Sequence, residues 1–179
     1  MQQTEYEEKR LLERADYDAL CGLLACRPVT EAVQINHYYD TPDGSMRREQ
    51  VTVRIRGRNG TLCGTVKRHG RDGCSTEARF PVDRLPDRLE VEGLSLSRQG
   101  SLTTCRRTYP LPGGFALMLD ENLYLGRTDY ELELEYPAGG CDRAEGILLC
   151  LQALIGRVLP ESPSKSERFF RRLADVNKT

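Results

Sequence analysis

Several short segments of this sequence alternate charged and apolar residues with a period of two. In DYELELEY (129–136), acidic residues occupy every second position, and in VTVRIR (51–56) two arginines alternate with apolar residues. Successive side chains of a β-strand point to opposite faces. These segments therefore predict strands that have one charged face and one apolar face.

The charged faces of these strands need opposite charges nearby. Glutamates in a row on one strand face repel one another, and neighbouring arginines on another strand present the same problem with the opposite sign. A half-solvated antiparallel sheet also shows this alternation, with water around its charged face. A lumen that holds a polyanion and a divalent cation would balance both sets of charges. The pattern by itself leaves both interpretations open.

Turn signals separate the predicted strands. Asn59-Gly60 is a strong signal for a two-residue hairpin, and Pro112-Gly113-Gly114 predicts another hairpin. A further turn is expected at 70–73, before an extended segment at 74–82. The chain as a whole shows about eight such extended segments with hairpin connections. We therefore expect an antiparallel sheet that closes into a barrel.

Helical patterns lie between and after these strands. Apolar periodicity predicts helices over 13–26 and 142–158, and Pro86, a favourable first-turn residue, predicts a helix over 86–97. The tail at 162–173 predicts a turn and a short helix. Because a barrel with a charged interior turns its apolar faces outward, the helices are expected to cover the outer wall. The fold class is therefore α+β: a closed eight-stranded antiparallel β-barrel with external helices, in one domain over 1–179.

Composition argues against several classes of protein. The chain has 26 basic and 27 acidic residues and a net charge of −1, so there is no electrostatic case for binding nucleic acid or an anionic membrane. The opening residues MQQTEYEEKR lack the apolar stretch of a signal peptide, and no segment approaches the roughly 18 apolar residues of a membrane span. We therefore expect a cytoplasmic protein. Its seven cysteines form no CxxC pair and are expected to be buried free thiols.

The charged segments also form an ordered series of motifs. Glu5-Tyr6-Glu7-Glu8-Lys9 is an ExExK motif. The later motifs are HYYDTPD (37–43), RIR (54–56), TVK (65–67), LDENLYLGRTDYELELEY (119–136) and SKS (164–166). In this order, and over almost the whole chain, they resemble the motifs of the CYTH family. This family, the triphosphate tunnel metalloenzymes, includes thiamine triphosphatases and class IV adenylyl cyclases.

The resemblance implies an eight-stranded tunnel that binds a triphosphate-containing small molecule together with Mg²⁺ or Mn²⁺. By that similarity, the residues expected to carry catalysis are Glu5, Glu7, Lys9, Arg54, Arg56 and Lys67. The residues expected to hold phosphate groups are Lys9, Arg54, Arg56, Lys67, Arg106 and Lys165. The residues expected to form the metal-binding acidic lining are Glu5, Glu7, Glu77, Asp120, Glu131 and Glu133.

Two of these assignments remain open at the level of sequence. Arg106 shares the strand face of Thr104, but a β-bulge would bring Arg107 inward instead. Glu135 shares the face of Glu131 and Glu133, so the acidic pair of the motif could be Glu133 and Glu135.

The resemblance favours metal-dependent hydrolysis of inorganic triphosphate or of an organic triphosphate such as thiamine triphosphate. The alternatives are an adenylyl cyclase of the same family and a non-catalytic module that binds polyphosphate or a nucleotide. We expect a monomer or a homodimer, with no nucleic-acid or membrane partner.

Overall fold

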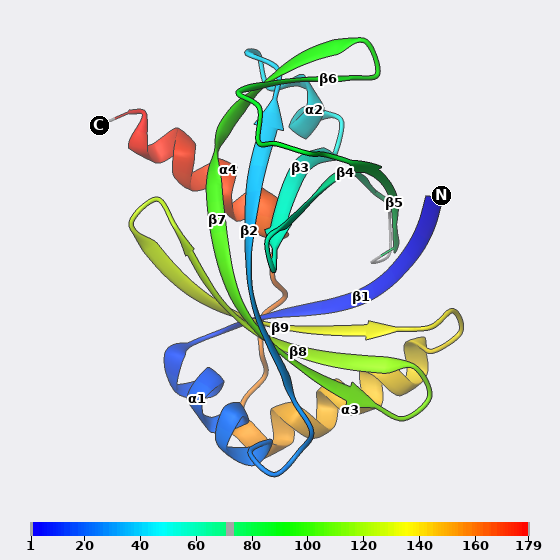
Figure 1. Ribbon diagram of the computed structural model, residues 1–179. Helices are drawn as coiled ribbons and strands as arrows, with labels where there is room; N and C mark the ends of the chain where they lie inside the picture. The colour runs from blue at the N-terminus through cyan, green and yellow to red at the C-terminus, as the bar shows by residue number, and fades with distance from the viewer. Residues whose placement is uncertain (1, 71–73, 179) are drawn as a thin grey trace.

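The computed structural model describes residues 2–70 and 74–178, which form nine strands and four helices (Figure 1). The strands are β1 (Gln2–Leu12), β2 (Thr30–Asp40), β3 (Val51–Arg58), β4 (Thr61–His69), β5 (Cys74–Pro81), β6 (Arg88–Val91), β7 (Leu94–Leu111), β8 (Phe115–Tyr124) and β9 (Arg127–Tyr136). The helices are α1 (Arg14–Leu23), α2 (Ser45–Arg48), α3 (Cys141–Ile155) and α4 (Lys165–Val176).

Eight of the strands close into an antiparallel barrel. They follow the order β2-β3-β4-β5-β1-β9-β8-β7, and β7 pairs back with β2. The closing ladder extends from Thr30 opposite Thr108 to Asp40 opposite Ser97, so it uses the full length of β2. The short strand β6 pairs with the first part of β7 and extends beyond the barrel wall (Figure 1). The predicted closed eight-stranded barrel is confirmed, with one additional strand.

The main apolar core lies outside the barrel, where α1 and α3 cover β8 and β9 (Figure 1). Leu132 and Leu134 of β9 are fully buried there, together with Leu20 of α1 and Leu148 of α3. A second apolar cluster joins the outer side of β3 to α2 and to the β6–β7 hairpin. Because the apolar side chains point outward, the alternating charged side chains of the same strands point into the lumen. The alternative of a half-solvated sheet is therefore wrong.

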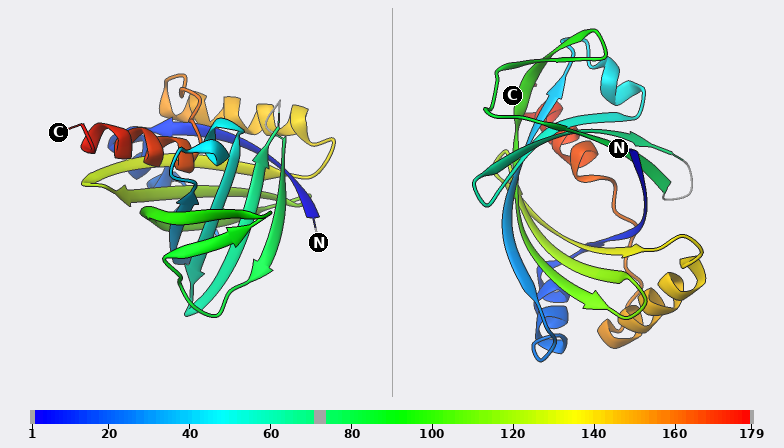
Figure 2. Two further views of the ribbon diagram at one scale, coloured as in Figure 1. Left: turned by 90° about the horizontal axis from the view of Figure 1, so that it is seen from above. Right: turned by 45° about the vertical axis from the view of Figure 1, so that its right-hand side comes forward.

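Helix α4 closes one end of the barrel. Its Phe169 and Phe170 pack against Tyr38, Leu102 and Tyr124, which belong to β2, β7 and β8. The rings of Tyr38 and Phe169 have their centroids 4.9 Å apart. The right-hand view of Figure 2 shows α4 behind the ring of strands. The tail of the chain therefore has a structural role as the cover of the lumen.

The helix predicted over 86–97 is wrong, because this segment forms β6 and the start of β7. Glu92 and Gly93 have φ values of 52° and 77°. Positive φ at both central residues is what a two-residue hairpin loop of type I′ requires. Pro86 lies just before the hairpin and does not begin a helix.

The other predicted elements are present with shifted ends. The helices predicted over 13–26 and 142–158 correspond to α1 and α3, and the tail forms α4. Asn59-Gly60 connects β3 to β4 with φ values of 50° and 76°, as expected for a type I′ hairpin. Residues 71–73 of the turn predicted at 70–73 lie outside the described residues.

All seven cysteines are free thiols, as expected from the lack of CxxC pairs. The expectation that they are buried is wrong, because none of the seven is fully buried, and Cys26, Cys141 and Cys150 are exposed. Cys141 begins α3, Cys150 lies on its solvent side, and Cys26 follows α1.

Candidate active site

The inner faces of the barrel strands surround a charged cavity of about 260 Å³, which we call the tunnel cavity. The pairing of the strands places these side chains on the same inner face. Lys9 on β1 lies opposite Glu133 on β9, and Arg54 on β3 lies opposite Tyr38 on β2. The residues that line it are Glu5, Glu7, Lys9, Tyr38, Thr52, Arg54, Arg56, Lys67, His69, Glu77, Arg79, Arg106, Glu133, Glu135, Ser164, Lys165 and Ser166. Every residue predicted to carry catalysis or to hold phosphate therefore lines one cavity.

Two residues of the predicted acidic lining, Asp120 and Glu131, do not line the tunnel cavity itself. Asp120 and Glu131 are fully buried on the same inner face of the barrel, below the lining residues. Lys165 of α4 bonds to Asp120 at 2.8 Å, to Glu133 at 2.6 Å and also to Glu131. Burial opposes the charge of Lys165, but these three carboxylates outweigh it and raise the pKa of its ammonium group.

Arg168, three residues after Lys165 on α4, extends this buried network. Its guanidinium lies 3.0 Å from Glu131 and 3.0 Å from Asp129. Both partners are buried, and the pairs are therefore shielded from solvent. The two cations attach the start of α4 to β9, so the carboxylates beneath the tunnel cavity already have cationic partners.

Arg106 faces inward and Arg107 faces outward, which answers the question that the sequence left open. Arg106 forms a two-pronged pair with Asp120 at 2.6 and 2.8 Å and also contacts Glu133. Burial works against the charge of Arg106, but Glu133 and Asp120 hold its pKa well above the ordinary value. Arg107 lies outside the lumen, where it is 41% exposed and pairs with Glu31 at 2.9 Å.

An acidic cluster of Glu7, Glu133 and Glu135 lies in the tunnel cavity. Their carboxylates each offer an oxygen within 4.8 Å of the others. Burial, together with the charge of Glu133, raises the pKa of Glu135. This crowding of negative charge fits a hard divalent cation, which prefers oxygen ligands. The deeper group of Asp120, Glu131 and Glu133 also has suitable spacing, but each of its members forms ion pairs with Lys165, Arg106 or Arg168. In the tunnel cluster, Glu135 forms no ion pair within the described residues, although Glu7 pairs with Lys9 and Lys67.

The wall formed by β2 and β3 has the opposite character. Arg54 pairs with Glu77 at 2.8 Å, but within residues 2–70 and 74–178 Arg56 forms no ion pair, and its Nε donates only to the Asn36 amide oxygen at 3.0 Å. Repulsion from Arg54, together with burial, lowers the pKa of Arg56 to about 9. In the same part of the chain, the Tyr38 hydroxyl, Asn36 Nδ2 and Arg54 Nε are buried without a hydrogen-bond partner. Buried unpaired donors beside a destabilised cation fit an anion.

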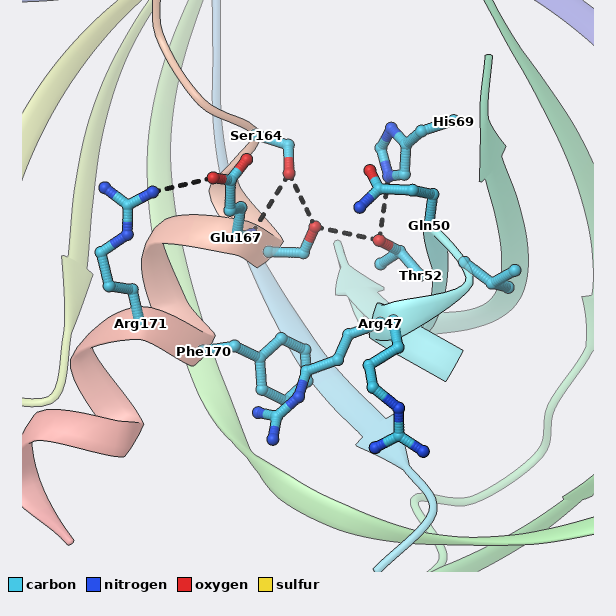
Figure 3. Close-up of a pocket in the computed structure, with 11 residues that line it drawn as sticks. Arg47, Gln50, Thr52, His69, Ser164, Glu167, Phe170 and Arg171 are labelled. Carbon is cyan, nitrogen blue, oxygen red and sulfur yellow. Dashed lines mark hydrogen bonds and ion pairs between the residues drawn. The ribbon is translucent and has the colours of Figure 1, made fainter. Parts of the chain in front are cut away.

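A chain of hydroxyl groups crosses the end of the tunnel cavity beside α4 (Figure 3). His69 Nε2 lies 3.0 Å from Thr52 Oγ1, which lies 2.9 Å from Ser166 Oγ, and this in turn lies 3.0 Å from Ser164 Oγ. Burial, together with Lys67 and Lys9, lowers the pKa of His69 to about 4. Its imidazole is therefore neutral at neutral pH and takes part in a neutral hydrogen-bonded chain.

The sequence model of the family described as "CYTH domain" matches residues 3–170. The chain belongs to the CYTH domain family. Its sequence is 28% identical over 149 residues to YjbK of Bacillus subtilis (strain 168), a proposed triphosphatase, and the match covers 75% of this chain and 78% of YjbK.

Solved CYTH-like structures share the fold at lower sequence identity. A proposed adenylate cyclase from Bacillus halodurans superposes with a TM-score of 0.77 at 22% identity, covering 94% of this chain and 98% of the other. A proposed adenylyl cyclase from Hippeastrum, described as having a dominant triphosphatase activity, superposes with a TM-score of 0.70 at 21% identity, covering 96% and 95%. At these identities the likeness establishes the architecture, and the activity has to be argued from the site.

Sequence reasoning missed several side chains of this CYTH site. Arg168 follows Lys165 by three residues, a spacing that places both on one face of a helix and could have indicated its role. Thr52 precedes Arg54 by two residues and shares its strand face. The role of Ser166 has no comparable signal in the sequence, because it depends on where α4 docks.

In the described part of the chain, no helix is both long and apolar enough to cross a membrane.

Proposed function

We propose that this CYTH domain hydrolyses a triphosphate substrate with the help of a divalent metal ion. One observation carries the proposal. Among the described residues, one wall of the tunnel cavity holds buried donors without hydrogen-bond partners and Arg56, which forms no ion pair, and another wall holds the crowded carboxylates of Glu7, Glu133 and Glu135. A polyanion fits the first wall and a cation fits the second. A metal–triphosphate complex supplies both charges together.

Glu7, Glu133 and Glu135 are the residues that would hold the metal, and Glu5 lies nearby on the same face of β1. When bound, Mg²⁺ or Mn²⁺ would neutralise phosphate charge and polarise the phosphorus–oxygen bonds. We assign Glu77 a different role, because it pairs with Arg54 at 2.8 Å and with Arg79 at 3.1 Å. Its carboxylate orients the guanidinium of Arg54 within the cavity.

The chain's own cations would position the phosphate groups and stabilise the charge of the transition state. Arg54 and Arg56 offer planar guanidinium groups that suit phosphate oxygens. Lys67 and Lys9 both donate to the same oxygen of Glu7, at 2.8 and 2.7 Å, and lie where they can contact the same phosphate chain. Phosphoryl transfer depends mainly on such positioning and charge neutralisation.

The reaction that fits this arrangement is direct attack of water on the terminal phosphorus atom. The new bond forms between the water oxygen and phosphorus, and the bridging phosphorus–oxygen bond breaks. With inorganic triphosphate, the products are phosphate and diphosphate. The cations around the bridging oxygen would stabilise the negative charge that develops on the leaving group.

Adenylyl cyclase activity is the second candidate, because the Bacillus halodurans protein is named a proposed adenylate cyclase, whereas the name of the Hippeastrum protein gives it a dominant triphosphatase activity. In that reaction a ribose hydroxyl, rather than water, would attack the first phosphate. A purely binding module is disfavoured by the acidic cluster, because a polyanion binder needs the cations and gains nothing from crowded carboxylates facing its ligand.

Phosphate release and cyclic nucleotide formation should be measured for inorganic triphosphate, thiamine triphosphate and ATP, with Mg²⁺, with Mn²⁺ and with EDTA. We expect phosphate release from at least one substrate that EDTA abolishes. Metal-independent release would contradict the proposed metal site. Cyclic nucleotide without free phosphate would replace the triphosphatase assignment by that of a cyclase.

A further inference from the structure

Arg168 of α4 is a buried arginine whose guanidinium joins the helix to β9 and to the segment that precedes α4. Its Nε donates to Asp129 at 3.0 Å, and Nη1 and Nη2 donate to the two oxygens of Glu131 at 3.0 Å each. Nη1 also donates to the Pro163 carbonyl oxygen at 2.7 Å and to the Ser162 hydroxyl. Burial opposes the charge of Arg168, but its hydrogen bonds and ion pair with Glu131 outweigh burial and raise its pKa. The contacts with both carboxylates are therefore charge-assisted.

The barrel wall fixes the position of Arg168 through Asp129. This carboxylate accepts hydrogen bonds from the Tyr124 hydroxyl at 2.6 Å and from Asn122 Nδ2 at 3.1 Å. The Thr104 hydroxyl in turn donates to Asn122 Oδ1 at 2.8 Å. All four of these side chains are buried, and they belong to β7, β8 and β9. The guanidinium is therefore held by the strands as well as by its own helix.

Lys165, one turn earlier on α4, has as many carboxylate partners as it has hydrogens to donate. An ammonium group carries three N–H donors. Its Nζ lies 2.8 Å from Asp120 and 2.6 Å from Glu133, and it also contacts Glu131. Lys165 lines the tunnel cavity as well. It can therefore donate to a phosphate oxygen there only by giving up one of these three carboxylates.

Glu131 is the carboxylate that Lys165 can leave at the lowest cost. Arg168 contacts both of its oxygens, so Glu131 stays paired when Lys165 moves away. Arg106 covers both oxygens of Asp120 in the same way, at 2.8 and 2.6 Å. Arg106 lines the tunnel cavity, however, where the proposed function needs its guanidinium for phosphate. Arg168 lies outside the lining of that cavity and remains with Glu131.

We propose that Arg168 is a positioning residue that holds Glu131, so that the Lys165 ammonium group can exchange this carboxylate for an oxygen of the bound triphosphate. The inference rests on the proposed function, since it concerns the same phosphate site. Without Arg168, Lys165 is the ion-pair partner that remains for Glu131 among the described residues. A buried carboxylate that loses its last cation is strongly destabilised, so Lys165 would then stay with Glu131.

The test measures binding of inorganic triphosphate in EDTA by calorimetric titration, so that the readout needs no metal. Arg168→Gln removes the charge but keeps an amide donor. We expect it to weaken binding about tenfold, on the order of one charge-assisted hydrogen bond. Arg172→Gln is the matched control, because Arg172 lies one turn further along α4 and its Nε donates to the Leu125 carbonyl oxygen at 3.4 Å. The control should bind triphosphate as the wild type does.

A second substitution separates positioning from a purely structural role. Glu131→Gln in the Arg168→Gln background removes the charge that holds Lys165. We expect the double variant to regain most of the lost affinity, a non-additive effect of two residues in contact. If Arg168 only supports the fold, loss of a second buried contact would leave binding as weak or weaken it further. That result would overturn the inference.

Arg168→Lys keeps the test decisive if Arg168→Gln does not fold. It keeps the buried charge, but an ammonium group lacks the planar fork that contacts both oxygens of Glu131. We expect weaker triphosphate binding than in the wild type, in a protein whose melting curve shows that it is folded. Binding equal to that of the wild type would overturn the inference.

The metal-free titration also separates this inference from the proposed function. If no triphosphate is hydrolysed with Mg²⁺ or Mn²⁺, the proposed function fails, and the titration still decides the role of Arg168. If the wild type hydrolyses triphosphate while Arg168→Gln binds it as tightly as the wild type, the inference fails and the proposed function stands. A wild-type protein that neither binds nor hydrolyses triphosphate would contradict both.

Discussion

Lys67 on β4 donates a hydrogen bond to Glu7 on β1 at 2.8 Å, although β5 lies between the two strands. Lys9 donates to the same carboxylate oxygen at 2.7 Å. Glu7 also belongs to the acidic cluster with Glu133 and Glu135. This side chain therefore lies where the cations of the barrel meet the carboxylates that suit a metal ion.

Glu7→Gln is expected to lower turnover while the fold remains intact. The amide keeps the shape of the side chain but removes one charge from the proposed metal site. We expect kcat to fall by about 100-fold, which corresponds to about 2.7 kcal/mol in the activation barrier. Glu8→Gln is the matched control, because Glu8 is the next residue on β1 and pairs with Arg10 at 2.9 Å. Unchanged metal-dependent hydrolysis in Glu7→Gln would exclude Glu7 as an essential ligand.

Lys165→Met is expected to destabilise the protein in addition to any effect on substrate. The substitution leaves Asp120, Glu131 and Glu133 buried without their shared ammonium group. Removal of one partner from a buried ion pair costs about 3–5 kcal/mol, and urea denaturation would measure the loss. Arg171→Met breaks an exposed pair with Glu167 on the same helix and should change stability by less than about 1 kcal/mol. Similar losses in both variants would contradict a structural role for Lys165.

The side-chain face of each strand could be predicted from the sequence, because burial on one side of a strand imposes a period of two. Arg54, Arg56, Lys67 and Arg106 all face inward as this period requires. The period does not report how far a side chain lies from the centre of the lumen. For that reason, sequence could not tell that Glu131 lies beneath the cavity wall while Glu135, on the same face, lines it.

The error over 86–97 has a local cause. A proline followed by mixed apolar and charged residues fits a helix start as well as it fits the approach to a hairpin. Whether this segment forms a helix or a hairpin depends on Glu92. Glu92 adopts the positive φ of 52° that the hairpin loop needs, although glutamate is not a usual residue for that conformation. Pairing of the following segment with β6, β2 and β8 outweighs the local preference. Such long-range pairing is not visible in a window of twelve residues.

His69 should make the stability of the protein depend on pH between about 6.5 and 4. Burial, Lys67, Lys9 and Arg54 lower its pKa to about 4, against the opposing effect of Glu7. The unfolded chain therefore takes up a proton near pH 6.5, before the folded protein does. The free energy of unfolding then falls as the pH is lowered, by at most about 1.4 kcal/mol per pH unit from this group.

His69→Gln should therefore make the pH dependence of stability shallower in this range. Glu135 acts in the opposite direction, because burial and Glu133 raise its pKa. The difference between variant and wild type is accordingly the quantity to measure, by urea denaturation at several pH values. His37→Gln should have the smaller effect, since His37 is less buried, although burial and Arg98 also lower its pKa. Identical pH profiles for wild type and His69→Gln would contradict the prediction.

Triphosphate and Mg²⁺ together are expected to stabilise this fold more than either does alone. Within the described residues, Arg56, with its lowered pKa, forms no ion pair, and neither does Glu135, with its raised pKa. A ligand that binds only the folded state at 100 times its Kd adds about 2.7 kcal/mol, which corresponds to roughly 5–10 °C in Tm for a domain of this size. Single phosphate reaches fewer of the cations and should add much less. The melting curves should be compared at constant ionic strength, because added salt also screens the repulsion within the lumen. A Tm that does not respond to triphosphate, with or without Mg²⁺, would mean that the charges of the tunnel cavity serve the fold alone.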